Sequence, residues 1–345
     1  MELSERQKKL LAAIVERYIA TGEPVGSKTL VDALGMPVSP ATVRNEMAAL
    51  TAKGLLEQPH TSAGRIPSGA GYRYYVDHLM KQYDLSPVEK RILDAKLRTA
   101  SGDSRQVLET ASSLLAELTH CAAVSTTPSD ASAVVRRVEL VPIGARTAMV
   151  VVLTSSGLIK SRVCRTDSEI TVDMAETFYN LVNENFLGKP TAAVTVAKIQ
   201  TLAVSLGEKA LLMTPLLVTL AQLAATTERT RMLLEGQSNL LGYREYAQNA
   251  FELMDFLRHA EPLDRVFSET PHAPNGEPSV VIGRENPYRE LQNSSMIFGK
   301  YVIAGHESGT LGLIGPTRMD YARLIPSLQY LTEIVGKVLS DNVEE

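Results

Sequence analysis

The segment from Ser39 to Pro67, SPATVRNEMAALTAKGLLEQPHTSAGRIP, constrains the fold of this chain more than any other stretch. Ser39 can cap a helix that begins at Pro40, because the N–H that proline lacks would have no partner in the first turn. Gly54 is suited to end this helix. A short strand and the turn HTSAGRIP follow, and the chain is expected to return in a second strand near Tyr72. The segment therefore predicts a helix followed by a compact hairpin.

The predicted helix has two faces of different character. Val43, Met47 and Leu50 fall on one stripe at helical spacing and are expected to face the core. The opposite side carries small or hydrogen-bonding side chains: Ala41, Thr42, Arg44, Asn45, Ala48 and Ala52. Alanine would let the helix axis lie close to DNA base edges, while asparagine suits adenine and arginine suits guanine in the major groove. Taken alone, the same pattern also describes an ordinary solvated helix face.

The elements on either side of this helix favour the DNA-binding interpretation. Apolar spacing predicts a helix from about Ser4 to Ala20 and a shorter one from Lys28 to Leu34. Three helices followed by a hairpin are the element order of a winged helix-turn-helix domain. The expected DNA contacts lie on the third helix and at the tip of the wing: Ser39, Thr42, Arg44, Asn45, His60, Thr61, Ser62 and Arg65. Arg65 is expected to meet a phosphate or the minor groove.

The charge of this N-terminal region is small for a DNA-binding module. Residues 1–80 hold nine Lys and Arg against eight Asp and Glu, a net charge of +1, while the whole chain of 345 residues carries −4. One copy should bind weakly, because the neutralisation of phosphates supplies much of the affinity for DNA. Two modules acting together would restore the affinity. The charge therefore favours a homodimer.

The remainder of the chain is long enough for further domains and alternates between helical and β-rich patterns. Val-rich runs read as one antiparallel sheet at 121–127, 134–142, 146–153 and 158–164. Helices are expected at 86–99, 104–119 and 169–186, and residues 191–262 are almost wholly helical in pattern apart from a strand near 230–234. Strands at 279–282, 295–304 and 311–314 and a helix at 320–339 complete the chain. A helical segment that interrupts a β-rich pattern indicates one domain inserted into another.

Several stretches resemble the HrcA family, the heat-inducible transcription repressors of bacteria. They are YIATGEPVGSKTL, SPATVRNEMAAL, GLLEQPHTSAGRIPS and GYRYYVDHL near the N-terminus, and GTLGLIGPTRMDY from Gly309 to Tyr321. The resemblance implies an α+β multidomain protein with an N-terminal winged helix-turn-helix and a GAF-like α/β sensor-type domain that a mainly helical dimerisation domain interrupts. It also implies a homodimer on an inverted-repeat operator of the CIRCE type ahead of chaperone operons. Heat stress would release the repressor, and a chaperonin of the GroEL/GroES type would keep it active.

Under this resemblance the chain divides into four parts. We expect a winged-helix domain at 1–83, a helical linker at 84–103, a GAF-like domain in two segments at 104–188 and 273–345, and the inserted dimerisation domain at 189–272. The apolar stretch Ala210 to Ala224 is rich enough to be core or subunit interface. Its composition alone favours core, whereas the resemblance favours the interface.

No feature of the sequence points to an enzyme. The six histidines show no metal-ligand spacing, and no G-x-S-x-G motif is present. Gly309, Gly312 and Gly315 do not fit a phosphate-binding loop and indicate a glycine-punctuated strand instead. Cys121 and Cys164 are expected to be plain buried thiols. We therefore predict no catalytic residue, no metal and no cofactor.

The sequence also bears on where the protein is located and on two rival functions. No apolar run is long enough to cross a membrane and the N-terminus lacks signal-peptide character, which predicts a cytoplasmic protein. One rival is a regulator switched by a small ligand in the GAF-like domain, although no residue set indicates a small-molecule ligand. Another is an RNA-binding winged helix, although the wing lacks an aromatic stacking platform. Double-stranded operator DNA remains the predicted partner.

Overall fold

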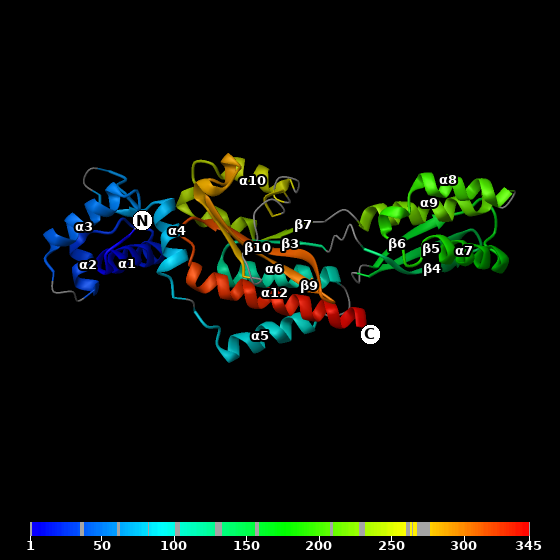
Figure 1. Ribbon diagram of the computed structural model, residues 1–345, viewed down its shortest axis with the longest axis horizontal. Coiled ribbons are helices and arrows are strands. Elements are labelled where there is room, and N and C mark those ends of the chain that lie inside the picture. The colour runs from blue at the N-terminus through cyan, green and yellow to red at the C-terminus, as the bar shows by residue number, and fades with distance from the viewer. Residues whose placement is uncertain are drawn as a thin grey trace.

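The structure is a computed structural model that describes residues 2–34, 38–60, 63–81, 83–100, 104–127, 133–155, 159–207, 210–227, 232–259, 263, 265–267 and 277–344. Three units follow one another along the long axis of the molecule (Figure 1). A small, mainly helical unit holds the N-terminus, and a five-stranded sheet with its helices occupies the middle. A three-stranded sheet with its own helices forms the far end.

The N-terminal unit contains the helices and hairpin that the sequence predicts. Its elements are α1 Glu5–Thr21, α2 Ser27–Leu34, α3 Pro40–Ala52, β1 Leu56–Glu57, β2 Ile66–Pro67 and α4 Gly69–His78. Ser4 and Gln7 cap α1 reciprocally, and Gly22 ends it in the left-handed region at φ 68°. Ser39 caps α3 ahead of Pro40. Apolar side chains of the first three helices share one core: Leu10, Leu11, Ile14, Leu30, Val43 and Leu50.

The second strand of the wing lies earlier than the sequence predicts. β2 covers only Ile66–Pro67, whereas Tyr72 belongs to α4 and is 2% exposed. Ser68 caps α4 by accepting a hydrogen bond from the Gly71 N–H at 3.0 Å. Because this cap starts a helix directly after β2, Tyr72 and Tyr75 are buried along one face of that helix and do not extend the hairpin.

The central unit is built on an antiparallel sheet with the strand order β7-β3-β10-β9-β8. Its strands are β3 Ala122–Thr126, β7 Met232–Glu235, β8 Ser279–Ile282, β9 Ser294–Ile303 and β10 His306–Pro316. The predicted glycine-rich strand is thereby confirmed, since Gly309, Gly312 and Gly315 all lie in β10. Short 3-10 turns complete the connections: η3 Gln237–Gly242, η4 Arg244–Tyr246, η6 Gly283–Glu285 and η7 Arg289–Leu291.

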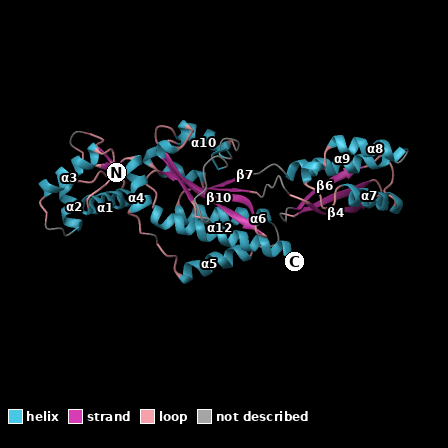
Figure 2. Ribbon diagram, in the orientation of Figure 1, coloured by secondary structure: helices cyan, strands magenta, loops and turns pink. Residues whose placement is uncertain are grey.

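Helices cover both faces of this sheet (Figure 2). α6 Ser104–Thr119 and α12 Tyr321–Glu344 pack on one face, and α10 Ala250–Arg258 packs on the other. Neighbouring residues of one strand point to opposite faces of the sheet, because side chains alternate along a strand. Ala123 and Ile297 belong to the core under α6 and α12, while Val124 and Phe298 belong to the core under α10.

The segment predicted as a linker at 84–103 is part of the central unit. α5 Pro87–Arg98 begins at the predicted capping box and packs against α6 and α12. Tyr330 of α12 donates a hydrogen bond to Asp94 at 2.8 Å, and the Lys90 ammonium lies 5.1 Å from the centre of the Tyr330 ring. The segment predicted as a helical linker is therefore helical, but its helix packs on the outer side of α6 and α12 in the central unit.

The far unit is built on β4 Val135–Gly144, β5 Thr147–Thr154 and β6 Ile159–Arg165, which pair in this order. α7 Val172–Asn185, η1 Thr191–Ala193, α8 Val196–Leu206 and α9 Ala210–Thr227 accompany the sheet. The apolar stretch 210–224 lies in α9, and several of its side chains are buried against the sheet and α7: Met213, Leu216, Leu217 and Leu220. For these side chains the expectation of a subunit interface is wrong, because they form the core of one chain.

The far unit is an insertion between two neighbouring strands of the central sheet. β3 pairs with β7, with Val124 opposite Leu234, although the whole far unit lies between them in sequence. This pairing contradicts the predicted start of the insert at 189 and places β7, which was predicted for the insert, in the central sheet. The predicted boundary at 272/273 lies outside the described residues. β4, β5, β6 and α7, which were predicted for the GAF-like domain, belong to the insert, and β7 and α10, which were predicted for the insert, belong to the central unit. β3 and β4–β6 were predicted to form one sheet, and only the strand pairing shows that they form two.

Polar contacts join the N-terminal unit to the central unit. Arg318, which follows β10, donates to Glu245 of η4 and, at 3.4 Å, to the Ile19 carbonyl near the end of α1. The N–H of Tyr83 donates to the Ala322 carbonyl of α12 at 3.0 Å. These bonds hold the winged helix against one end of the central sheet.

Candidate nucleic-acid interface

α3 presents to solvent the face that the sequence predicts. Its exposed side chains include Ala41, Arg44, Asn45, Ala48 and Ala52, whereas Val43, Met47 and Leu50 are buried. Within the part of the chain that the structure describes, Arg44 and Asn45 have no side-chain partner. Both side chains are therefore available to hydrogen-bond base edges.

Glu46, the single acidic residue of α3, is held against α1. Arg6 forms an ion pair with it at 2.9 Å, and the Gln7 amide donates to its second oxygen at 3.0 Å. The Glu46 side chain is only 17% exposed. No acidic side chain of α3 is therefore free to offset the positive charge of Arg44 on the exposed face of this helix.

The hydroxyl groups at the start of α3 bond to one another. Ser39 Oγ accepts a hydrogen bond from the Thr42 N–H at 3.2 Å and lies 3.0 Å from Thr42 Oγ1. Ser39 is exposed and Thr42 is half-buried. The structure thus brings these two predicted site residues together in a cap that fixes the start of the helix.

The wing projects beside α3, with His60 exposed in its turn. The His60 carbonyl accepts a hydrogen bond from the Ala63 N–H at 2.9 Å, which closes this turn. Thr61 and Ser62, two further predicted site residues, lie outside the described residues.

Arg65 lies at the base of the wing, which corrects its expected place at the tip. Its N–H and its carbonyl both bond to Val25, each at 2.9 Å, so the wing is joined to the chain ahead of α2. Its Nε donates to Thr51 Oγ1 near the end of α3 at 3.1 Å. A Cβ at Gly64 would lie 2.4 Å from the Val25 carbonyl oxygen, so this close approach requires glycine. Arg65 is held between the wing and the third helix.

A groove of about 520 Å³ runs between the start of α2, the exposed side of α3 and the wing. Lys28, Arg44 and Arg65 line it, and none of the lining residues that the structure describes is acidic. Three cations in one groove suit the phosphate backbone of a nucleic acid. Reasoning from the sequence misses Lys28, although a lysine in the first turn of the helix before the predicted reading helix is a usable signal.

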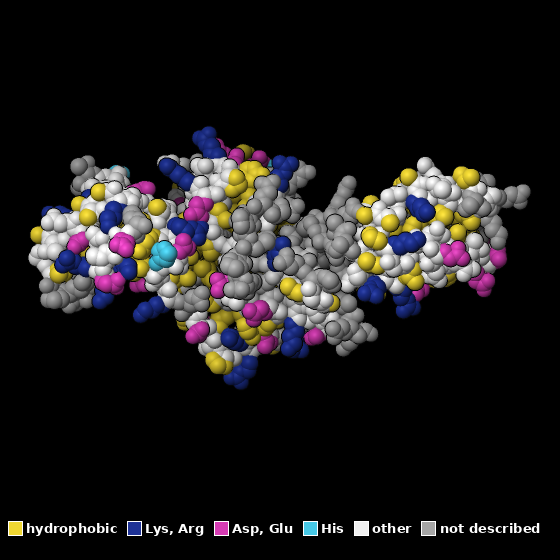
Figure 3. Space-filling view, viewed as in Figure 1, with side chains coloured by type: hydrophobic (Ala, Val, Ile, Leu, Met, Phe, Trp, Pro, Cys, Tyr) yellow, Lys and Arg dark blue, Asp and Glu magenta, His cyan; other side chains and the backbone are white. Residues whose placement is uncertain are grey.

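The rest of the N-terminal unit is not uniformly basic. On the face that Figure 3 shows, Lys and Arg side chains alternate with Asp and Glu side chains over this end of the molecule. This mixture agrees with the net charge of +1 over residues 1–80. The groove is therefore the place where unopposed positive charge gathers.

Other chemistry finds little support in the described residues. They contain no group of three His, Cys, Asp or Glu that could hold a metal ion. Cys121 and Cys164 are free and buried, as predicted. Burial raises the pKa of the Cys121 thiol to about 11, so this thiol is neutral at pH 7. None of the described helices is long and apolar enough to cross a membrane.

Two family models match the chain. The model described as "Winged helix-turn-helix transcription repressor, HrcA DNA-binding" matches residues 2–77, which span α1, α2, α3 and the wing. The model described as "HrcA protein C terminal domain" matches residues 105–325. The first covers the N-terminal unit, and the second covers the insert and all five strands of the central sheet, while α5 and most of α12 lie outside both matches.

Full-length relatives agree with the family models. The chain is 32% identical to the heat-inducible transcription repressor HrcA of Acetivibrio thermocellus, with 99% of each protein covered. It is 34% and 35% identical to those of Moorella thermoacetica and Desulforudis audaxviator, with 98% of each protein covered. A crystal structure described as that of a hypothetical protein shares the fold with a TM-score of 0.68 at 24% identity, covering 99% of this chain and 100% of its own. The chain therefore belongs to the HrcA family of heat-inducible transcription repressors, which are DNA-binding proteins and not enzymes.

Proposed function

We propose that this protein represses chaperone operons by binding an inverted-repeat operator of the CIRCE type as a homodimer, and that heat stress releases it. The observation that carries the proposal is the groove lined by Lys28, Arg44 and Arg65 beside the exposed Asn45. Lys28 and Arg65 are suited to phosphates, while Arg44 and Asn45 can hydrogen-bond base edges.

In this proposal α3 enters the major groove. Arg44 would pair with guanine, which offers two acceptors there, and Asn45 would pair with adenine, which offers one donor and one acceptor. The exposed alanines of α3 let the helix approach the base edges closely. Ser39 and Thr42 would contribute mainly by holding the first turn, since their hydroxyls already bond to each other.

The other contacts would go to the DNA backbone. Lys28 and Arg65 line the same groove as Arg44 and are suited to phosphates of the DNA backbone. At the tip of the wing, His60, Thr61 and Ser62 would approach the backbone or the minor groove. Few cations serve each module, so one copy would bind weakly and two copies on one operator would bind well.

The open face of the inserted sheet offers a surface for the second copy. By the strand register, Val141, Met149 and Val163 form one cross-strand row, and Ile159 lies opposite Leu153 farther along. Val141, Val163 and Ile159 are 41%, 57% and 65% exposed. The other face of the sheet packs on α7 and α9. Exposed apolar side chains gathered on one sheet face are typical of an interaction surface, and a two-fold axis would present the same face from both copies.

The heat response would follow from the limited stability of the repressor. A marginally stable protein loses its active fraction steeply as temperature rises. If a chaperonin of the GroEL/GroES type refolds the repressor, the amount of active repressor would depend on how much chaperonin is free. Damaged proteins that occupy the chaperonin would leave the repressor inactive and the chaperone operons expressed.

A DNase footprint on the region upstream of this protein's own gene tests the proposal. We expect protection of two half-sites in inverted repeat, and loss of that protection after brief heating. A footprint on a single unrepeated site, or none, would overturn the proposed operator.

Substitutions on the inserted sheet test the dimer separately. Val163→Glu should yield monomers in analytical ultracentrifugation and weaken the footprint. Val204→Glu is the matched control, since Val204 is 85% exposed on α8 and outside the sheet. A dimer that survives Val163→Glu and Ile159→Glu would rule out this face as the interface.

A further inference from the structure

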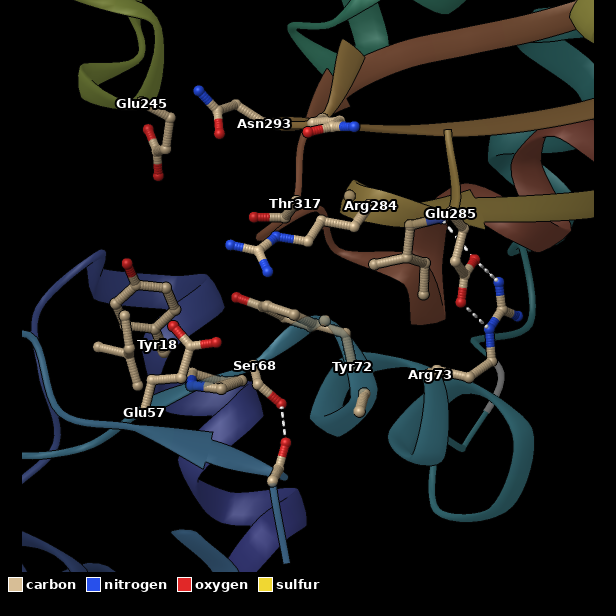
Figure 4. Close-up of a pocket in the computed structure, with 18 residues that line it drawn as sticks. Tyr18, Glu57, Ser68, Tyr72, Arg73, Glu245, Arg284, Glu285, Asn293 and Thr317 are labelled. Carbon is tan, nitrogen blue, oxygen red and sulfur yellow. Dashed lines mark hydrogen bonds and ion pairs between the residues drawn. The ribbon is translucent and has the colours of Figure 1, made fainter. Parts of the chain in front are cut away.

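A cleft of about 800 Å³ lies between the winged helix and the central sheet, and the proposed DNA contacts leave it unused. Figure 4 shows the side chains that enter it from both units. Tyr18 of α1, Glu57 of the wing and Tyr72 of α4 come from the N-terminal unit. Glu245 of η4 and Arg284 of η6 come from the central unit. Any molecule bound here would touch both units.

Two polar atoms at the cleft are buried without a hydrogen-bond partner among the described residues. Tyr72 is 2% exposed, its hydroxyl has no partner, and in Figure 4 this hydroxyl points into the cleft. Glu245 bonds to Arg318 through one carboxylate oxygen, but its Oε2 is buried and unpartnered. Buried polar groups are nearly always paired in folded proteins, so two such atoms on one cleft indicate a ligand. Burial raises the pKa of Tyr72 well above its ordinary value, which keeps the hydroxyl a donor.

Arg284 and Glu57 add unpaired charges of opposite sign. Both side chains are exposed, and neither forms an ion pair within the described chain. Arg73 and Glu285 also line the cleft, but they pair with each other. The cleft thus offers one unused guanidinium on the central wall and one unused carboxylate on the winged-helix wall.

These groups match a small zwitterion better than an ion of one sign. A phosphate would suit Arg284 but would face the carboxylates of Glu57 and Glu245. A simple cation would suit the carboxylates but would leave Arg284 and the Tyr72 hydroxyl unused. An ammonium group can donate to Glu57 and to Glu245 Oε2, while a carboxylate accepts from Arg284 and Tyr72. The volume is in the range of small-molecule sites and exceeds what a single ion needs.

We infer that this cleft binds an amino acid or a dipeptide and that the bound molecule holds the winged helix in this orientation to the sheet. A ligand that contacts both walls stabilises the orientation of the winged helix that brings the two walls together. Its binding is then linked to the binding of operator DNA, because the operator also selects among orientations of the winged helix.

Isothermal titration calorimetry on the full-length protein tests the inference without DNA. The probes are the common L-amino acids and dipeptides that contain glycine. At least one should bind saturably, and Arg284→Gln should weaken it about tenfold, as the loss of a charge-assisted hydrogen bond does. Arg289→Gln is the matched control, because Arg289 is exposed in the neighbouring η7 and does not line the cleft.

Tyr72→Phe separates a ligand contact from a structural role. It should weaken the same probe about tenfold while leaving the thermal midpoint unchanged or raised, because the hydroxyl has no partner to lose among the described residues. A lowered midpoint with unchanged affinity would assign Tyr72 to the fold alone and overturn its part in the site.

Two results would overturn the inference as a whole. One is the absence of binding by every probe, and the other is binding that Arg284→Gln and Tyr72→Phe both leave unchanged. A probe that binds but shifts operator affinity less than about twofold would remove the link to DNA. A normal operator footprint beside absent probe binding would overturn this inference and leave the proposed repressor function standing.

Discussion

Arg73 of α4 and Glu285 of η6 join the winged helix to the central sheet across 212 positions of the sequence. Arg73 Nε donates to Glu285 Oε1 at 2.9 Å, and Arg73 Nη2 donates to Oε2, so the pair is bidentate. The same Nη2 donates to the Val280 carbonyl at 2.6 Å, and Glu285 Oε2 also accepts from the Ile282 N–H at 2.8 Å. These added bonds position both side chains, and the pair thereby sets the orientation of α4 against the sheet.

Removing either partner should loosen this junction. Arg73→Gln and Glu285→Gln should each lower the free energy of unfolding by about 1 kcal/mol, because the side chains are 30% and 40% exposed and solvent weakens the pair. The double variant should cost less than the sum of the two. Thermal unfolding followed by circular dichroism measures this double-mutant cycle. Strictly additive losses would contradict a direct interaction.

Arg44→Ala and Asn45→Ala should abolish operator specificity while leaving the dimer intact. Each lost base contact should cost about 1–3 kcal/mol on the operator and much less on scrambled DNA. Footprint titrations on both sequences measure the difference. Arg91→Ala serves as the control, because Arg91 is exposed on α5 in the central unit. If both variants gave the footprint of the unmodified protein, the assignment of α3 as the reading helix would be wrong.

Lys28→Gln and Arg65→Ala should each flatten the dependence of affinity on salt by about one unit, as the loss of one phosphate contact does. The weakening should be similar on operator and random DNA. Lys53→Gln is the control, since the Lys53 ammonium is bonded to the Glu2 carbonyl and the Gln7 amide oxygen. If Arg65→Ala instead lowers the affinity for the operator more than the affinity for random DNA, Arg65 contacts the minor groove.

Gly64→Ala should destabilise the winged helix by about 1–3 kcal/mol, because the added Cβ would overlap backbone atoms of Val25, the nearest at 2.4 Å. Gly69→Ala is the matched control. A Cβ there meets no atom within 4 Å, and alanine is the better helix former in α4. Thermal midpoints from circular dichroism compare the two. Equal midpoints would show that the wing is not held against Val25 in solution.

Cys121 should make the fold sensitive to alkali. Burial raises the pKa of its thiol from an ordinary 9.0 to about 11 in the folded state. The folded pKa lies above the unfolded one, so the stabilising effect of the neutral thiol is complete below pH 9 and is lost as the pH rises to about 11. At pH 8, iodoacetamide should modify Cys121 in urea but not in the native protein, as mass spectrometry would show. Equal rates in both states would contradict the burial.

Local signals allowed most elements to be predicted. The cap at Ser39, the proline at the first position of α3 and the capping box that starts α5 each act within one turn of chain. The exposed face of α3 follows from helical spacing, so the positions of Arg44 and Asn45 needed no tertiary information. The strands of the central and far units were also placed to within a few residues, because alternation and Val content are local properties.

Relations between distant segments could not be predicted in the same way. Residues 134–165 read as strands of the sheet that β3 begins, yet they form a sheet of their own, since strands of similar pattern can pair with many partners. The place of Arg65 at the base of the wing depends on the backbone of Gly64 meeting Val25, a contact across two loops. The groove with Lys28 and the cleft with Tyr72 exist only after such contacts have formed.

The sequence by itself determined that the chain carries a winged helix with a capped reading helix, because each of those signals lies within a few residues and needs no partner from elsewhere. The tertiary structure alone decided which strands make the insert, where Arg65 lies, and how Arg73 and Glu285 set the winged helix against the sheet. Hydrogen bonds and packing between distant segments decide these arrangements. The local sequence pattern of one segment does not specify its partner in another.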